Sequence, residues 1–193
     1  MSSWFSSARE RRLWIWTGAA VAAIYSTIPL AGSLIRVMPD NNQAGFLFIV
    51  AMILIGATII LEGLKIRLSG AEIGIALGIV AVYLLAIARL GISVAERSHL
   101  IEYGVVAVFI HQALLERASQ GRHVRLPALL AILVTTVIGV LDECLQFFMP
   151  NRVFDPIDMG QNFLAAFTAV LASVVLAWAR QKVGRLVEER RRR

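Results

Sequence analysis

Long apolar blocks, separated by short polar breaks, fill most of the chain between residues 13 and 179. The blocks are long enough to cross the hydrocarbon core of a bilayer, which takes about 20 helical residues. In lipid a helix satisfies its backbone hydrogen bonds within one segment, so this pattern predicts transmembrane α-helices. We expect an all-α, multi-pass bundle of six transmembrane helices, at Leu13–Ile35, Ala44–Leu61, Ala71–Leu90, Leu100–Leu115, Pro127–Phe147 and Pro156–Ala179.

Capping and helix-breaking residues support the ends of these spans. Ser69 followed by Glu72 is a capping-box pattern, which indicates the start of the third helix. Pro127 suits the first turn of the fifth helix, and Asp155-Pro156 suits the N-cap and first position of the sixth. We therefore expect a short N-terminal tail (1–12), one membrane domain (13–179) and a basic C-terminal tail (180–193).

The lysines and arginines are distributed unevenly between the two sides of the expected bundle. Fifteen of the nineteen fall on the side that holds both chain ends and the loops near residues 65 and 122. Cytoplasmic loops carry the excess of positive charge, so both termini are predicted to be cytoplasmic in a bacterial inner (plasma) membrane. The four basic residues expected on the other side are Arg36, Arg89, Arg97 and Arg152.

Composition agrees with a membrane protein and narrows its partners. Hydrophobic residues make up 58% of the chain and charged residues only 17%, and the mean hydropathy is +0.73. The formal net charge is +6, but the positive residues lie at helix ends and in the tail, without interleaved aromatic residues. This arrangement favours anionic membrane lipids as partners over nucleic acid. With a single cysteine, Cys144, an internal disulfide is excluded.

Polar residues of the last three predicted helices converge at the end of the bundle that faces away from the cytoplasm. An ionisable group at membrane depth costs about 2.5–3.5 kcal/mol on insertion scales, so such groups normally face the bundle and pair. Helical spacing places His99 with Glu102, and Asp142 with Gln146, on shared faces. The candidate site residues are His99, Glu102, Asp142, Glu143, Gln146, Arg152, Asp155, Asp158 and Asn162.

The segment from Gly139 to Asn162, GVLDECLQFFMPNRVFDPIDMGQN, resembles the signature of the VanZ-like family. In that family an Asp-Glu-x-x-Gln helix end precedes Pro-x-Arg, then Asp-x-x-Asp and a helix-borne Asn. The upstream segment Glu96–Gly104 is similar to the family's His-x-x-x-Tyr stretch, and the resemblance covers about residues 95–170. The matching positions are His99, Glu102, Tyr103, Asp142, Glu143, Gln146, Pro150, Arg152, Asp155, Asp158 and Asn162.

The resemblance implies an integral membrane protein of the bacterial cell envelope, but it implies no particular reaction. The family is named after a teicoplanin-resistance accessory protein, and no reaction is firmly assigned to it. This chain departs from the family at Ala165 and Ala166, where a glycine usually follows the Asn. That departure affects helix packing more than chemistry.

Two interpretations of the polar cluster remain open. In the first, it is a site for a periplasmic or lipid-linked substrate. The candidates for acid, base or hard-metal ligand in that site are Asp142, Glu143, His99, Glu102 and Asp158. Arg152 then holds an anionic phosphate or carboxylate group. In the second, the same residues form a satisfied network that pins the last three helices together.

The expected role follows from these two interpretations. The first predicts a cell-envelope accessory or binding protein, or an enzyme acting on a lipid-linked or glycopeptide-related substrate. The second predicts an accessory structural subunit that packs against other membrane protein subunits. Whether the chain is an enzyme is left open at this point, and no cofactor is predicted.

Three residues outside the cluster are given simpler interpretations. His111 and Gln112 near the cytoplasmic end of the fourth helix are expected to form hydrogen bonds between helices. Cys144 is expected to be a small buried hydrophobe. No metal site is assigned, because the single His-x-x-Glu at His99 and Glu102 lacks a second such pair on another helix.

Overall fold

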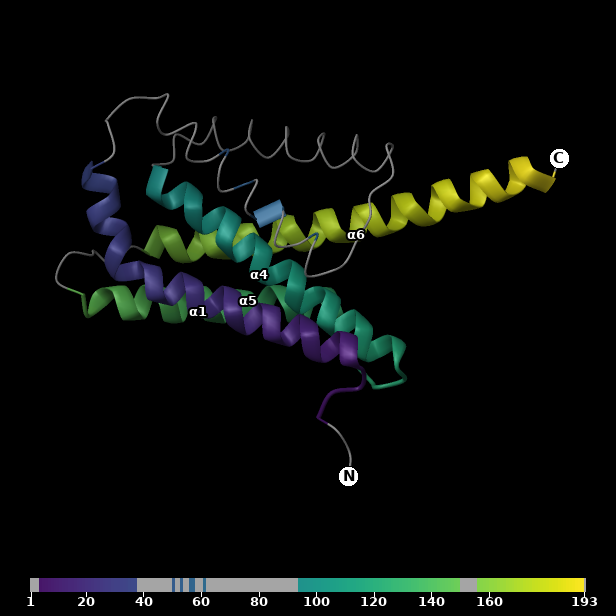
Figure 1. Cartoon of the computed structure of the whole chain (residues 1–193), viewed down its shortest axis with the longest axis horizontal. Coiled ribbons are helices and arrows are strands. Elements are labelled where there is room, and N and C mark those ends of the chain that lie inside the picture. The colour runs from purple at the N-terminus through teal and green to yellow at the C-terminus, as the bar shows by residue number, and fades with distance from the viewer. Residues whose placement is uncertain are drawn as a thin grey trace.

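A computed structural model describes residues 4–37, 94–149 and 156–192, together with five isolated positions between them: Val50, Ile53, Gly56, Ala57 and Leu61. Side chains are described chiefly over residues 4–26, 100–149 and 156–179. The described chain is all-α (Figure 1). Its four helices are α1 (Ala8–Val37), α4 (Val94–Ser119), α5 (Pro127–Phe147) and α6 (Pro156–Arg192).

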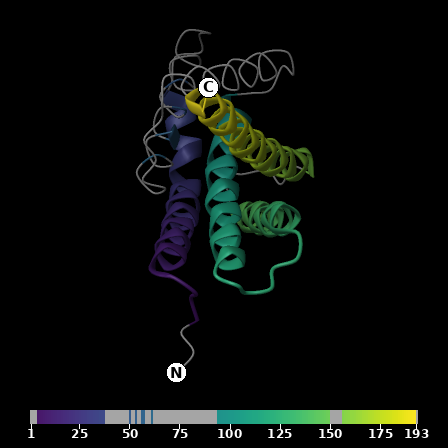
Figure 2. The same ribbon diagram turned by 90° about the vertical axis from the view of Figure 1, so that its right-hand side faces the viewer.

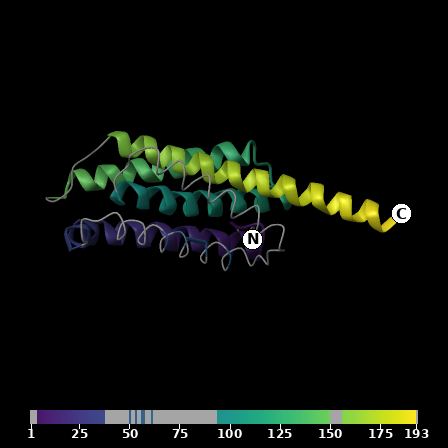
Figure 3. The same cartoon turned by 90° about the horizontal axis from the view of Figure 1, so that it is seen from above.

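Helix α4 is the centre of the described bundle. It contacts α1 on one side and both α5 and α6 on the other, and α5 also packs along α6. Figures 2 and 3 show this arrangement, with α4 between α1 and the α5–α6 pair. The buried core joins large side chains of α4 to small ones of α5 and α6, which let the helices approach closely. Its members include Leu100, Tyr103, Val106, Ile110, Ala131, Ala165 and Ala166.

Among the described helices, two of the predicted spans are long and apolar enough to cross a membrane, as judged by their length and composition. Helix α5 has a mean hydropathy of 2.1, and residues Pro156–Ala179 of α6 reach 1.9. Only 28% and 22% of the residues in these windows are buried. A core helix of a soluble protein is mostly buried, so the outward-facing apolar side chains of α5 and α6 agree better with contact to lipid.

The six-helix bundle itself is not confirmed by the structure. The predicted third span, 71–90, lies outside the described residues, as does most of the second, 44–61. The five isolated residues between Val50 and Leu61 are helical, and Gly56 lies against Ile101 and Val105 of α4. The capping-box residues Ser69 and Glu72 also lie outside the described part.

The described helices match the predicted spans most closely at α5, whose bounds are the predicted ones. The other three extend beyond the predicted spans. Helix α1 begins five residues before Leu13, α4 is longer at both ends than 100–115, and α6 continues past Ala179 through the basic tail. Hydropathy marks where apolar residues stop, whereas a helix ends only where its backbone bonds are capped or broken.

Helix α6 is long enough to project beyond the other described helices. Its 37 residues correspond to about 55 Å of helix, well beyond the roughly 30 Å of a bilayer core. Figure 1 shows the last part of α6 extending past the other described helices. The predicted basic tail is therefore a helical extension of α6 as far as Arg192.

The turn between α4 and α5 has two residues in the left-handed region. The N–H of Gly121 donates to the Ala118 carbonyl at 3.1 Å, and the N–H of Arg122 donates to the Arg117 carbonyl at 3.3 Å. These two bonds form a Schellman motif, which requires the positive φ of 79° at Gly121. Leu126, the N-cap of α5, also has a positive φ, 52°, and Pro127 then begins the helix as predicted.

The simpler sequence interpretations have mixed outcomes. His111 Nδ1 lies 3.2 Å from Ser173 Oγ of α6, and Gln112 Nε2 donates to the same oxygen at 3.2 Å. The expected hydrogen bonds between helices are thus confirmed. The prediction for Cys144 is wrong: this side chain is exposed, on the outward face of α5 that also carries Leu141 and Leu145. Its apolar character suits lipid as well as a protein core, so hydropathy alone does not distinguish the two.

Candidate functional site

The last two turns of α5 place three polar side chains inside the bundle. We call Asp142, Glu143 and Gln146 the carboxylate cluster. Asp142 and Glu143 are 0% exposed and Gln146 is 2% exposed. Gln146 Nε2 donates to Glu143 Oε1 at 3.0 Å and lies 3.4 Å from Asp142 Oδ2. One amide therefore serves two buried carboxylates that are neighbours in the sequence.

Two tyrosines, one from α1 and one from α4, lie next to the carboxylate cluster. Tyr103 of α4 is fully buried, and its side chain interacts electrostatically with Asp142. Tyr25 of α1 lies within electrostatic range of Asp142, and its hydroxyl donates to the Ile138 carbonyl of α5 at 2.8 Å. The cluster thus lies where α1, α4 and α5 meet.

Helix α6 approaches α5 one turn away from the carboxylates, at Gly139. Asn162 is 0% exposed, and its Nδ2 lies 3.4 Å from the Gly139 carbonyl. A Cβ at position 139 would lie 2.7 Å from Asn162 Cβ, so only glycine fits this crossing without a shift. Within the described part of the chain, no hydrogen-bond partner is found for Asn162 Oδ1 or for the buried hydroxyl of Thr135.

The structure brings together part of the set that the sequence predicts. Asp142, Glu143, Gln146 and Tyr103 are one group, and Asn162 lies a turn away. Glu102 is half-buried and interacts electrostatically with Tyr103. Asp158 is half-buried in the first turn of α6.

The remaining predicted site residues fall outside what the structure describes. His99 lies in α4, but its side chain is not among those described. Pro150, Arg152 and Asp155 lie outside the described residues, so the expected binding of an anionic group by Arg152 stays a prediction. No group of three or more His, Cys, Asp or Glu residues that could hold a metal ion occurs over the described ranges.

A second polar network, which sequence reasoning missed, lies at the opposite end of the described helices and is centred on Glu10. Ser7 is the N-cap of α1, where its Oγ accepts the N–H of Glu10 at 3.0 Å. Glu10 is 0% exposed and accepts from the N–H of Ser6 at 2.6 Å and from Trp14 Nε1 at 3.3 Å. It also forms an ion pair with Arg117 of α4 at 3.0 Å. The pattern Ser-x-x-Glu at 7–10 is a capping box, a signal that could have located this helix start.

A further pair of contacts ties the start of α1 to the end of α4. Ser7 Oγ donates to Glu116 Oε1 at 2.8 Å, and Arg9 forms an ion pair with Glu116 at 3.2 Å. A terminal nitrogen of Arg117 donates to the Trp4 carbonyl at 2.7 Å. We call this the basic end of the bundle, because Arg9, Arg117 and the arginines of the α4–α5 turn all lie there.

Electrostatics keep Glu10 ionised in spite of its position. Burial raises the pKa of Glu10, but the hydrogen bonds from Ser6, the charge of Arg117 and the bond from Trp14 together outweigh that effect. The pKa of this carboxyl group therefore lies below its ordinary value of 4.5. At neutral pH the charged form is the one that joins α1 to α4.

The sequence analysis did not predict that Tyr25 and Gly139 belong to the surroundings of the carboxylate cluster. Tyr25 lies 113 residues from the carbonyl it contacts, and Gly139 matters only because α6 crosses there. A tyrosine within an otherwise apolar span was the available signal, since its hydroxyl needs a partner when buried.

Comparison with protein-family models, with curated proteins and with solved structures finds no match for this chain. The VanZ-like resemblance therefore has no support beyond the motif residues themselves. The geometry of the carboxylate cluster is the basis from which a function can be argued.

Proposed function

We propose that the chain is a VanZ-like integral protein of the bacterial plasma membrane that binds a cell-envelope ligand at its carboxylate cluster. On this proposal the protein has six spans, both termini are cytoplasmic, and the carboxylate cluster faces the extracytoplasmic side. The position of Arg9, Arg117, Arg122 and Arg125 at one end of the helices supports this orientation, because cytoplasmic ends carry the positive charge.

The observation that carries the proposal is the complete burial of Asp142 and Glu143 side by side. Removing charges from water is expensive, and apolar side chains of similar volume often stabilise a fold better than a buried charged group does. A bundle that needed only to pack would gain little from two adjacent carboxylates. Intramembrane ionisable residues therefore point to function by default.

The ligand chemistry follows from the donors and acceptors of the cluster. Ionised carboxylates only accept hydrogen bonds, and the shared amide of Gln146 is already directed at both of them. Asn162 Oδ1, one turn away at Gly139, adds a buried oxygen for which the described residues offer no hydrogen-bond partner. A ligand that presents hydroxyl, amide or ammonium donors suits this set, as the polar part of a lipid-linked or glycopeptide-related envelope molecule would.

An accessory structural subunit is the second candidate, and the bonds between helices favour it. Tyr25 and Asn162 join α1 and α6 to α5 through hydrogen bonds, and Tyr103 of α4 interacts electrostatically with Asp142 of α5. Such a network fixes the relative positions of four helices. The exposed apolar side chains of α5 and α6, such as Leu133, Val137, Phe163 and Leu171, would then contact other membrane subunits.

Conservative removal of the two charges distinguishes these candidates. For a binding site, we expect Asp142→Asn and Glu143→Gln to keep the melting temperature in detergent close to that of the wild type, because a neutral amide of the same size avoids the cost of burying a charge. The cell should nevertheless lose its normal profile of susceptibility to envelope-targeting antibiotics. For a structural network, both stability and phenotype should fall together. Cys144→Ser, next to Glu143 but exposed, is the matched control and should leave both unchanged. If neither carboxylate variant alters stability or phenotype, both candidates are wrong.

The orientation is tested separately with single cysteines in a Cys144→Ala background. We expect a membrane-impermeant maleimide added to spheroplasts to label Phe148→Cys, because Phe148 is exposed just beyond the carboxylate cluster. Ser119→Cys, exposed at the basic end, should react only after the membrane is permeabilised. Labelling in the reverse order would contradict the proposed topology.

A further inference from the structure

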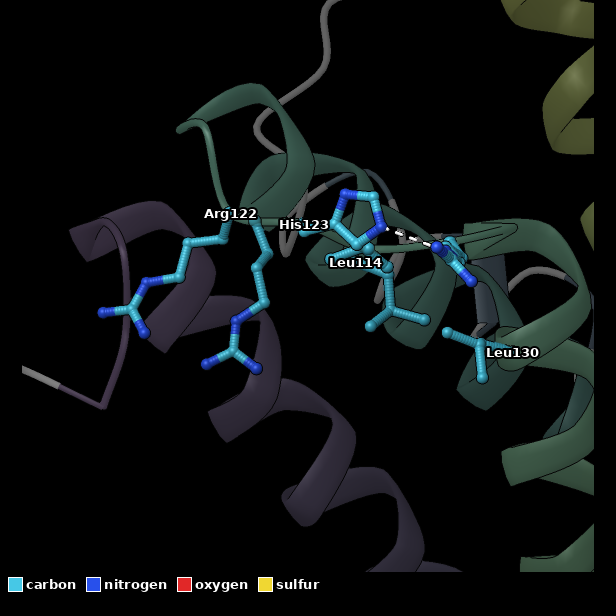
Figure 4. A pocket seen from close by; sticks show the side chains of 7 residues that line it. Leu114, Arg122, His123 and Leu130 are labelled. Carbon is cyan, nitrogen blue, oxygen red and sulfur yellow. Dashed lines mark hydrogen bonds between the residues drawn. The ribbon is translucent and has the colours of Figure 1, made fainter.

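A hollow of about 500 Å³ opens at the basic end of the bundle, between the end of α4 and the start of α5. Its apolar side is formed by Leu114 of α4 and Leu130 of α5. Figure 4 shows these two leucines together with Arg122 and His123 of the connecting turn. Arg117 and Arg125 also line the hollow, and none of the lining residues that the structure describes is acidic.

The basic side chains of the hollow are held by a defined turn. The Schellman motif at Gly121 fixes where the chain leaves α4, and Pro127 fixes where it enters α5. Arg125 Nε donates to His123 Nε2 at 3.1 Å, which orients the guanidinium. Arg122 and Arg125 are both exposed, so their charges are directed to the surface of the hollow rather than into the core.

The start of α5 adds a second source of positive potential. Helix α5 has 21 residues, and its N-cap, Leu126, provides no side-chain hydrogen bond. The first N–H groups of a helix point outward and carry the positive end of its dipole, so an uncapped N-terminus attracts anions. Here that terminus lies beside the arginines of the hollow.

We infer that this hollow binds the headgroup phosphate of an anionic phospholipid. Arginine pairs with phosphate oxygens through two parallel hydrogen bonds, and the uncapped α5 start complements the same charge. The hollow lies at the first turn of a helix apolar enough to cross a membrane, which is the depth of lipid headgroups. Leu126, Leu129 and Leu133 are exposed directly below it along α5, where an acyl chain would lie.

This site is distinct from the carboxylate cluster, and it rests only on the proposed placement of α5 across a membrane. A free phosphate shares the headgroup's chemistry but lacks an acyl chain. The apolar side of the hollow and the leucines below it favour the lipid, and the experiment separates the two sources.

The test measures thermal stabilisation of the purified full chain in detergent as short-chain phosphatidylglycerol, phosphatidylcholine or inorganic phosphate is added. We expect saturable stabilisation by phosphatidylglycerol alone. The double variant Arg122→Gln/Arg125→Gln should weaken its apparent affinity by about tenfold or more, since two charge-assisted contacts are lost. The matched control is Lys182→Gln/Arg185→Gln, which removes two exposed charges from the tail of α6 and should retain the wild-type affinity.

Three results would overturn the inference. Equal weakening by both double variants would mean unspecific attraction to total charge. Equal stabilisation by phosphatidylcholine would mean that anionic headgroups are not selected, and equal stabilisation by inorganic phosphate would mean a phosphate site that needs no lipid. The melting temperature of each variant without lipid verifies that it is folded. Cysteine labelling of Ser119 and Phe148 tests the membrane placement independently, so failure of the lipid site leaves that result unaffected.

Discussion

Gly139→Ala is expected to destabilise the bundle more than any other single methyl addition at a described glycine. The new Cβ would lie 2.7 Å from Asn162 Cβ and 2.8 Å from Asn162 Nδ2. Asn162 is fully buried, so its side chain has no free space to move into, and α5 and α6 must separate. Overpacking of this kind typically costs about 1–3 kcal/mol. The measurement is the unfolding free energy or melting temperature of the detergent-solubilised protein.

Gly160→Ala is the matched control for this substitution. Gly160 lies in α6, two residues before Asn162, and a Cβ there would meet nothing within 4 Å. Alanine has a higher helix propensity than glycine by about 1 kcal/mol, so this variant should be as stable as the wild type or more stable. Equal effects of the two variants would mean that α5 and α6 do not cross at Gly139 as the structure has them.

The crossing at Gly139 also shows why sequence predicts elements better than contacts. The bounds of α5 follow from a run of apolar residues that begins at Pro127 and ends with the polar last turns, and the structure has the same bounds. That information is local. The need for glycine at position 139 depends on Asn162, 23 residues away, and nothing in the local pattern of α5 indicates it.

The site was predictable to the extent that its residues share one helix or one motif. The spacing of Asp142 and Gln146 placed both on one face of α5, and both are buried with Glu143. Their contacts with Tyr25 and Tyr103 come from helices packed side by side, so they depend on rotation and depth. Periodicity constrains neither quantity closely in helices that are apolar on most sides.

The helix termini at the basic end were missed for a different reason. Hydropathy placed the first helix at Leu13, whereas Ser7 caps it and the first polar turn contains Glu10. A polar turn at the end of a span has no apolar signal, although it is still helical. Its stabilisation comes from a cap and from ion pairs with α4, which lies more than a hundred residues further along the chain.

Glu10→Gln is the second substitution for which we expect a large effect. It keeps the size of the side chain but removes the negative charge that accepts from Ser6 and Trp14 and pairs with Arg117. Glu10 is 0% exposed, and hydrogen bonds to a buried charged group contribute about 1.5–3 kcal/mol. We expect a loss of that order in unfolding free energy at pH 7, measured in detergent.

Arg9→Gln is the control, because it removes an ion pair at the same helix start. The Arg9 side chain is 48% exposed, and pairs of this kind contribute about 0–1 kcal/mol. Its loss should therefore change stability only slightly. If Arg9→Gln were as destabilising as Glu10→Gln, the stabilisation would come from general charge at the basic end rather than from the buried carboxylate.

The pH dependence of stability provides an independent test of the same carboxylate. The pKa of Glu10 is lower in the folded protein than its ordinary value of 4.5, so folding favours the ionised form. The resulting stabilisation is complete above about pH 4.5 and is lost as the pH falls through the lower, folded-state pKa. Wild-type protein should therefore lose stability more steeply in acid than Glu10→Gln, and the two stability curves should converge. Parallel curves across this range would show that Glu10 does not carry the charge that joins α1 to α4.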